Sequence, residues 1–264
     1  KIAFIDALSA AGLPVIEVSA FVSPKWVPQM ADAGEVAAGI ARRPGTRYTA
    51  LVPNLAGLER ARAARLDEVA IFAAASETFS RRNINQSIDA SLDTYRGVCE
   101  RAGALGIRVR AYLSTAFGCP FEGAVPADRV AAVAQAIVAM GAFEVSVSDT
   151  IGIAHPGQVP IVVEAVAARI GLERTALHFH DTRGTALANV LAALDLGVAT
   201  FDASAGGLGG CPYAPGATGN LATEDLVYML DGLGIRTGVS LDAVVEASAR
   251  IAPHVGHEPA SRYF

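Results

Sequence analysis

Short apolar runs alternate with longer amphipathic segments along most of the chain. The apolar runs are rich in β-branched residues and predict strands at residues 15–18, 48–52, 69–72, 109–113, 143–148, 176–180 and 200–204. The amphipathic segments predict helices at residues 2–11, 57–65, 88–105, 126–140, 157–170, 185–196, 221–232 and 241–251. Strands that alternate with helices favour a parallel sheet joined by right-handed crossovers.

A closed (β/α)8 TIM barrel fits this alternation better than an open doubly wound sheet. No G-x-G-x-x-G turn follows an early strand, which argues against a dinucleotide-binding fold. A barrel needs eight strands, and the helix at residues 2–11 is of the kind that follows a first strand. We therefore expect an α/β barrel whose first strand lies ahead of Lys1, with extra helices at its C-terminal side. We expect residues 1–264 to form one catalytic domain, truncated at both ends.

Composition narrows the class of protein. Hydrophobic residues make up 52% of the chain and charged residues 18%, which provides for a large core and favours a homo-oligomer, a dimer or larger. The net charge of −5 contains no block of like charges, so neither nucleic acid nor a membrane surface is expected as a partner. The odd number of cysteines favours reduced thiols. We expect a cytoplasmic bacterial protein, or one of the mitochondrial matrix if it is eukaryotic.

Two histidines end the predicted strand at residues 176–180. His178 and His180 are two positions apart, so in a strand both side chains point to the same face, about 7 Å apart. The carboxyl ends of barrel strands carry the active site, where two imidazoles and an oxygen ligand can hold a divalent ion. A single histidine there is more often a hydrogen-bonded core residue, but the pair favours metal. An amidohydrolase-type site is disfavoured because no other histidine ends a later strand.

A glycine-rich segment, residues 206–220, follows the last predicted strand and contains Cys211. Its length and flexibility are typical of a lid that closes over substrate, while a phosphate-binding loop and a purely structural loop are the alternatives. Asn220 is expected to begin the next helix and to offer its amide oxygen to the ion. Glu224 and Asp225 follow in the first turn, where the helix dipole alone would favour acids.

Two acidic residues lie at unusual places in predicted strands. Glu17 interrupts the apolar run at residues 15–18, where a carboxylate is costly unless it is paired. We expect it to face the barrel mouth and meet a cation, although no arginine in the predicted strands is an obvious partner. Asp149 closes the strand at residues 143–148 and precedes Thr150, and an acid at this place is more often functional than structural.

Taken together, these segments resemble the 3-hydroxy-3-methylglutaryl-CoA lyase family, within a wider group of metal-dependent barrel lyases and aldolases. The similarity extends over nearly the whole chain and is most specific in the Gly-Gly-Cys-Pro-Tyr stretch and the Gly-Asn-Leu-Ala-Thr-Glu-Asp stretch that follows it. The matching segments are residues 20–30, 72–77, 83–85, 148–152, 178–182 and 206–229. The family's Arg-Asp-Gly motif on the first strand, which supplies a further metal ligand and an arginine, is not in this sequence.

The resemblance implies a metal-assisted retro-Claisen cleavage of 3-hydroxy-3-methylglutaryl-CoA to acetoacetate and acetyl-CoA, a step of leucine degradation and ketone-body formation. It implies that Mg²⁺ or Mn²⁺ binds to His178, His180 and Asn220. Cys211 would protonate the product carbanion, and Asp149 or His178 would act as the base. Further expected roles are catalytic for Glu17 and substrate-binding for Arg82, Asn83, Ser146 and Thr150.

Three alternatives stay open. The first is a lyase for a longer 3-hydroxy-3-acylglutaryl-CoA, with Ala20, Tyr112 and Ser146 shaping the acyl pocket. The second is an aldolase or an acetyl-CoA-condensing synthase of the same group, against which the Cys211 segment argues. The third is a non-catalytic barrel that binds acyl-CoA, which the missing Arg-Asp-Gly motif suggests.

Overall fold

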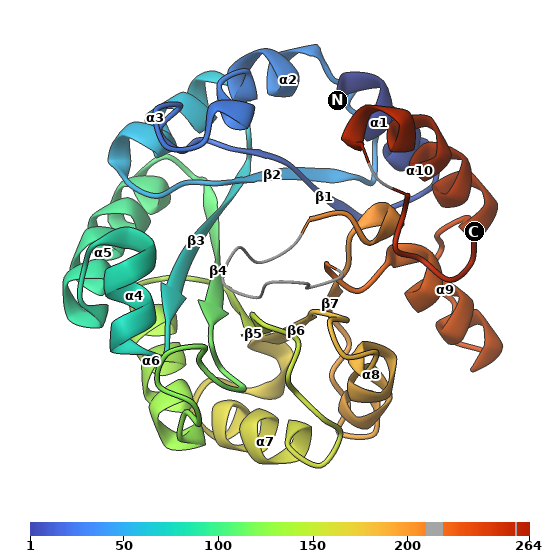
Figure 1. Ribbon diagram of the computed structural model, residues 1–264. Helices are drawn as coiled ribbons and strands as arrows, with labels where there is room; N and C mark the ends of the chain where they lie inside the picture. Colours follow the sequence, from blue (N-terminus) through green and yellow to red (C-terminus); the bar gives the residue numbers. More distant parts are fainter. Residues whose placement is uncertain (210–218, 257) are drawn as a thin grey trace.

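The computed structural model describes residues 1–209, 219–256 and 258–264. Within these residues, seven parallel strands form one sheet that curls around a central axis, with helices on its outside (Figure 1). The strands pair strictly in chain order, without the reversal that marks a doubly wound sheet, as a barrel requires. They are β1 (Val15–Ala20), β2 (Arg47–Leu51), β3 (Glu68–Ala74), β4 (Arg108–Ser114), β5 (Glu144–Asp149), β6 (Thr175–Phe179) and β7 (Phe201–Asp202).

Helices follow the strands and bury their apolar sides against the outer face of the sheet. The α-helices are α1 (Ile2–Ala10), α2 (Ala33–Gly39), α3 (Leu55–Ala63), α4 (Glu77–Ile84), α5 (Ile88–Ala104), α6 (Ala127–Ala139), α7 (Val159–Ile170), α8 (Ala186–Leu194), α9 (Thr223–Gly232) and α10 (Leu241–Val255). Short 3₁₀ turns are η1 (Pro28–Met30), η2 (Leu172–Arg174) and η3 (Ala205–Gly207). Side-chain caps from Asn54, Ser76, Ser87 and Ser240 fix four of the helix starts.

The core is a continuous layer between the sheet and these helices. β3 is buried along almost its whole length, which explains its apolar run from Val69 to Ala74. At the opposite side of the sheet from β3, α1 packs against α10, and the Ser240 N–H donates to the Ala11 carbonyl at 2.8 Å (Figure 1). Among the described residues, no helix is long and apolar enough to cross a membrane.

Most of the predicted elements are confirmed, and the differences have local causes. α2 and α4 were not predicted, because both are short and much of each helix is exposed. The last strand is only Phe201–Asp202 instead of residues 200–204, since Ser204 forms an isolated bridge with Ala222. Asn220 was predicted to begin a helix, which is wrong. It lies three residues before α9 and forms a bridge with His180. The strand expected ahead of Lys1 stays a prediction.

Candidate metal and substrate site

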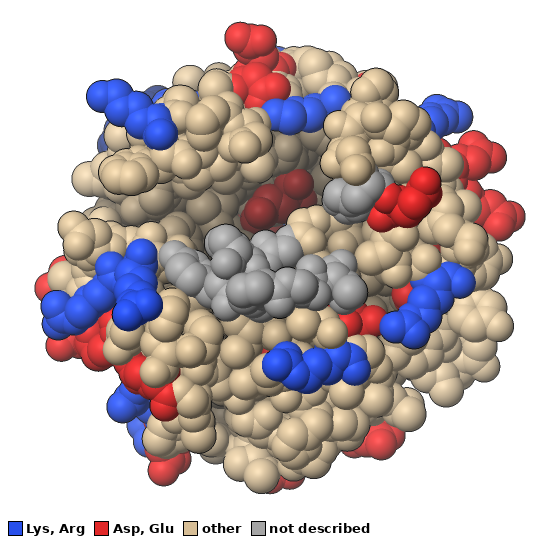
Figure 2. All heavy atoms as spheres, in the orientation of Figure 1, with Lys and Arg blue, Asp and Glu red and all other residues tan. Residues whose placement is uncertain are grey.

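Polar side chains meet on the inner face of the curled sheet. The Tyr112 hydroxyl on β4 donates to Glu17 on β1 at 2.8 Å, and the Ser146 hydroxyl on β5 donates to Asp202 on β7 at 2.6 Å. These strand pairs are not neighbours in the sheet, so the contacts cross its concave interior. Figure 2 shows a hollow on this side of the molecule, with acidic atoms deep inside it.

Arg110 on β4 brings a positive charge to the inner face of the sheet. Its Nε donates to Glu144 Oε1 at 2.5 Å, and its Nη2 lies 2.9 Å from Asp202 Oδ1. Burial alone would raise the pKa of Asp202, but the charges of Arg110 and His178 outweigh burial and hold that pKa well below its usual range. Among the described residues, Glu17 forms no ion pair with an arginine, so the cation expected beside it is not found there; the Arg110 charge only lowers its pKa from a distance.

Glu17 faces the hollow from β1, as predicted. The register of β1 against β2 shifts between Glu17 and Ser19, a bulge of the kind that re-aims a side chain beside a site. The Glu17 side chain is exposed to solvent in the hollow, yet reduced hydration between the surrounding strands raises its pKa, and the Tyr112 hydrogen bond only partly offsets this effect. A carboxyl group with a raised pKa can take part in proton transfer near neutral pH.

His178, His180 and Asn220 are brought together at the carboxyl end of β6. His180 and Asn220 form an antiparallel bridge, flanked by the hydrogen bonds from Asp181 N to Gly219 O (3.1 Å) and from Leu221 N to Phe179 O (3.0 Å). The bridge places the two side chains next to each other, and the ring centroids of His178 and His180 lie 5.2 Å apart. The pair at positions i and i+2 therefore shares one face, as the sequence indicates.

The donor atoms of these three side chains suit a divalent cation. Within the part of the chain that the structure describes, His180 Nδ1 and Asn220 Oδ1 are buried without a hydrogen-bond partner, and His178 Nδ1 lies 3.5 Å from Asp202 Oδ2. Burial and the neighbouring His178 lower the pKa of His180 to about 4, so this imidazole is neutral, the form that binds metal. The described residues contain no cluster of three or more His, Cys, Asp or Glu side chains that could hold an ion, so Asn220 would be the third ligand.

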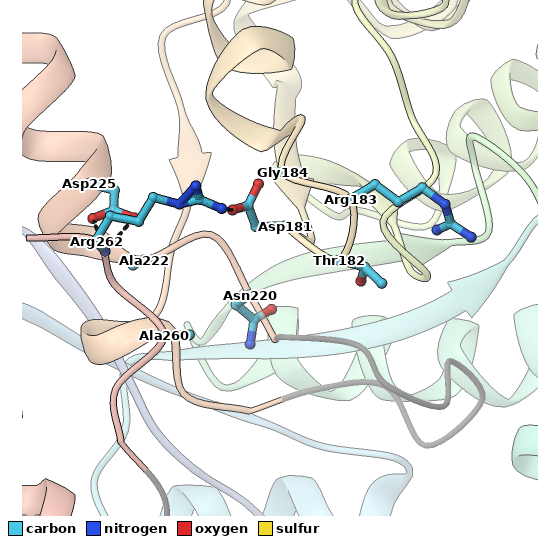
Figure 3. Close-up of a pocket in the computed structure, with 9 residues that line it drawn as sticks. All are labelled: Asp181, Thr182, Arg183, Gly184, Asn220, Ala222, Asp225, Ala260 and Arg262. Carbon is cyan, nitrogen blue, oxygen red and sulfur yellow. Dashed lines mark hydrogen bonds and ion pairs between the residues drawn. The ribbon is translucent and has the colours of Figure 1, made fainter.

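A cavity of about 420 Å³ lies beside Asn220 (Figure 3). The Arg262 side chain extends to Asp181, with Nη2 3.7 Å from Asp181 Oδ2, and the Arg262 backbone N–H donates to Asp225 at 3.0 Å. Arg183 turns to the other side, where it donates to the carbonyls of the β5–α7 loop. The full lining is Asp181, Thr182, Arg183, Gly184, Asn220, Ala222, Asp225, Ala260 and Arg262.

Asp149 and Thr150 shape the loop after β5. Both Asp149 oxygens accept backbone N–H groups, from Ile153 at 3.0 Å and Ala154 at 3.1 Å, yet burial still raises the pKa of Asp149 to about 6. The Thr150 hydroxyl accepts from the Thr115 N–H at 2.7 Å. Its backbone hydrogen-bonds His180. These two residues thus hold the rim next to the histidine pair.

The remaining predicted residues lie elsewhere or cannot be placed. Arg82 and Asn83 are on the exposed side of α4, with the Arg82 guanidinium 4.2 Å from the Phe121 ring centroid. Glu224 is fully buried and accepts from Gly206 N–H and the Ser248 hydroxyl, which ties α9 to η3 and α10. Cys211 lies outside the described residues.

Asp202 and Arg110 were not among the predicted site residues. The available signal was the alternation of polar residues in the fourth strand, where Arg108, Arg110 and Tyr112 lie two positions apart. Such alternation indicates side chains on one face of a strand. Asp202 interrupts the last predicted strand in the same way that Glu17 interrupts the first.

The curled parallel sheet and its inward-facing polar residues define an α/β barrel-type protein with a candidate cation site at the carboxyl end of its strands. The chain belongs to the HMGL-like family, which it matches over residues 1–251. It is 54% identical to the 3-hydroxy-3-isohexenylglutaryl-CoA/hydroxy-methylglutaryl-CoA lyase of Pseudomonas aeruginosa over 262 residues, 99% of this chain and 87% of that protein.

Solved structures agree. A crystal structure of hydroxymethylglutaryl-CoA lyase from Pseudomonas aeruginosa superposes with a TM-score of 0.97 at 54% identity, covering 99% of this chain and 87% of the other. An HMG-CoA lyase from Acinetobacter baumannii, in complex with coenzyme A and 3-methylmalate, gives a TM-score of 0.94 at 39% identity and covers 99% and 85% of the two chains.

Proposed function

We propose that this protein is a lyase that cleaves 3-hydroxy-3-methylglutaryl-CoA into acetoacetate and acetyl-CoA. The observation that carries the proposal is the meeting of His178, His180 and Asn220 at the end of β6, where His180 Nδ1 and Asn220 Oδ1 are buried without a hydrogen-bond partner among the described residues, within a chain of the HMGL-like family. The interior of the curled sheet adds carboxylates with displaced pKa values, as proton-transfer chemistry needs.

His178, His180 and Asn220 would hold Mg²⁺ or Mn²⁺. A bound divalent ion supplies Lewis acidity, which makes a substrate hydroxyl easier to deprotonate. The chain's contribution is to keep His180 neutral by burial and to hold Asn220 beside it through the bridge. His180 is thereby available to an ion without first losing a proton at neutral pH.

Proton transfer would use residues around this set. His178 and Asp149 are the candidate bases, and the pKa of about 6 for Asp149 suits a base near neutral pH. Both oxygens of Asp149 also accept backbone N–H groups of its own loop, which fixes the orientation of this carboxyl group. Glu17 would act from the opposite strand, and Cys211 would protonate the carbanion of acetyl-CoA.

The substrate would lie across the carboxyl ends of the strands. Arg82 and Asn83 on α4 are the proposed contacts to coenzyme A, Ser146 and Thr150 are the proposed contacts to the acyl part, and Ala20 and Tyr112 border its pocket. The complex of the Acinetobacter baumannii relative with coenzyme A supports an acyl-CoA partner. The name of the Pseudomonas aeruginosa relative covers two substrates, so a longer 3-hydroxy-3-acylglutaryl-CoA is the second candidate.

The proposal includes one catalytic domain whose cylinder is closed by an eighth strand between β1 and β7. In the described residues, these two strands pair on one side only. A homo-oligomer and a cytoplasmic location stay predictions from composition.

The full-length protein is expected to convert 3-hydroxy-3-methylglutaryl-CoA to equal amounts of acetoacetate and acetyl-CoA when Mg²⁺ or Mn²⁺ is added. Removal of the ion with a chelator is expected to stop the cleavage, and added Mn²⁺ to restore it, because the ion supplies the Lewis acidity that the reaction needs. Coupled enzymatic assays of both products measure this. A parallel reaction with 3-hydroxy-3-isohexenylglutaryl-CoA tests the longer substrate.

Two outcomes would contradict the proposal. Binding of the thioester without cleavage, at any concentration of ion, would indicate a non-catalytic acyl-CoA-binding barrel. Condensation of acetyl-CoA with a keto acid, without cleavage of either hydroxyacyl-CoA, would indicate a synthase of the same group.

A further inference from the structure

We propose that Asp202 is a positioning residue that orients the His178 imidazole for the ion, and that Arg110 holds Asp202 in place. The inference rests on the proposed role of His178 as a metal ligand. The ion pairs of Arg110 with Asp202 and Glu144 have no role in the proposed reaction otherwise.

The carboxylate of Asp202 is fixed by donors from two other strands. Oδ2 accepts from the Ser146 hydroxyl at 2.6 Å and from Arg110 Nη1 at 3.2 Å, while Oδ1 lies 2.9 Å from Arg110 Nη2. The Arg110 side chain is only 7% exposed, so little water competes for these contacts. A carboxylate held from two sides in this way has little freedom to rotate.

Asp202 presents the same Oδ2 to His178. His178 and Asp202 are paired in the register of β6 and β7, and His178 Nδ1 lies 3.5 Å from Oδ2. Nδ1 is buried, and no other hydrogen-bond partner faces it within the described residues. The His178 ring also packs edge-on against two other rings. Its centroid lies 5.2 Å from that of His180 and 6.3 Å from that of Tyr112.

An acceptor at Nδ1 determines which ring nitrogen carries the proton. With Nδ1–H directed at Asp202, the lone pair of Nε2 is left for the cation, an arrangement that recurs where carboxylates support metal-binding histidines. Asp202 therefore acts through His178, without touching substrate or ion. The role of Arg110 is to hold the Asp202 carboxylate stationary.

Glu144 offers a matched control. It is the other carboxylate bound to Arg110, through Nε, and its side chain is 15% exposed against 22% for Asp202. No described contact joins Glu144 to His178. Asp202→Asn and Glu144→Gln thus each remove one charge from the Arg110 ion pairs, but only the first changes the acceptor that faces the histidine.

The test compares Mn²⁺ binding by the full-length wild-type protein and these two variants, measured by titration calorimetry or by the electron paramagnetic resonance of free Mn²⁺. Asp202→Asn is expected to raise the Kd for Mn²⁺ about 10–100-fold, as loss of an outer partner of a ligating histidine typically does. Glu144→Gln is expected to bind Mn²⁺ nearly as the wild type does. A Kd of Asp202→Asn equal to that of the wild type would overturn the inference.

A second measurement needs no variant and so does not depend on how Asp202→Asn folds. Imidazole ¹⁵N spectra of the wild-type protein without metal are expected to show the His178 proton on Nδ1, and a proton on Nε2 would overturn the inference. Failure of the proposed function gives a different result from failure of this inference. If the wild-type protein cleaves no substrate and binds no Mn²⁺, the metal site itself is disproved, and the inference with it.

Discussion

His180→Ala is expected to abolish tight binding of Mn²⁺ and to lower kcat/KM for cleavage of 3-hydroxy-3-methylglutaryl-CoA by about 10³-fold or more. The size of the effect follows from the several kcal/mol that a metal ion typically contributes to stabilising charge in a transition state, since each 1.36 kcal/mol is a factor of ten in rate. His180 is 7% exposed and kept neutral by its surroundings, and its bridge partner Asn220 supplies the neighbouring oxygen. Alanine removes the nitrogen and leaves only His178 and Asn220 of the three proposed ligands.

The control for this prediction is His155→Ala, since His155 is exposed and lies outside the histidine pair. This variant is expected to keep the Mn²⁺ affinity and the turnover of the wild-type protein. Thermal unfolding of both variants without metal separates loss of the ion from loss of the fold. A His180→Ala protein that is folded and binds Mn²⁺ with unchanged Kd would remove His180 from the metal site.

The sequence predicts the strands and the histidine pair because both are local patterns. A run of β-branched residues indicates a buried parallel strand whatever its neighbours in the sheet are. Residues 178 and 180 share a face in any strand. The pairing of Arg110 with Asp202 is not local, because it depends on how far the sheet curls and on the register of β4 through β7. The position of Asn220 was mistaken for a similar reason: the bridge to His180 joins two segments forty residues apart in the chain.

Buried charges also explain why the polar interior was only partly predicted. The sequence shows that Glu17 is costly in an apolar strand, and hence that it needs a partner. It does not show that the partner is the Tyr112 hydroxyl, three strands away, while Arg110 is occupied by Glu144 and Asp202. Asp149 shows the same limit, since its position at a strand end indicates a site, but its oxygens bind its own loop.

Arg110→Met is expected to lower the free energy of unfolding by about 3–5 kcal/mol, the cost of removing one partner from a buried ion pair. Methionine fills most of the volume of the arginine stem but leaves the carboxylates of Asp202 and Glu144 without their cation, at 22% and 15% exposure. Urea unfolding measures the loss. Arg81→Met is the control, because the exposed pair of Arg81 with Glu77 on α4 belongs to a class that contributes about 0–1 kcal/mol. Equal stability of the two variants would contradict the prediction.

The loss caused by Arg110→Met is also expected to depend on pH. The pKa of Asp202 in the folded protein is lowered from its ordinary 3.8, so ionisation of this carboxyl favours the fold above pH 3.8, and the contribution disappears as the pH falls further. Without Arg110, burial dominates and raises the pKa of Asp202. Protonation at low pH therefore removes a buried charge from the folded variant, whereas it lowers the free energy of unfolding of the wild type. The difference in unfolding free energy between the two proteins should therefore be largest near neutral pH and shrink as the pH approaches 3. A difference that stays constant from pH 7 to pH 3 would show that methionine acts through packing and that the ion pairs of Arg110 contribute little.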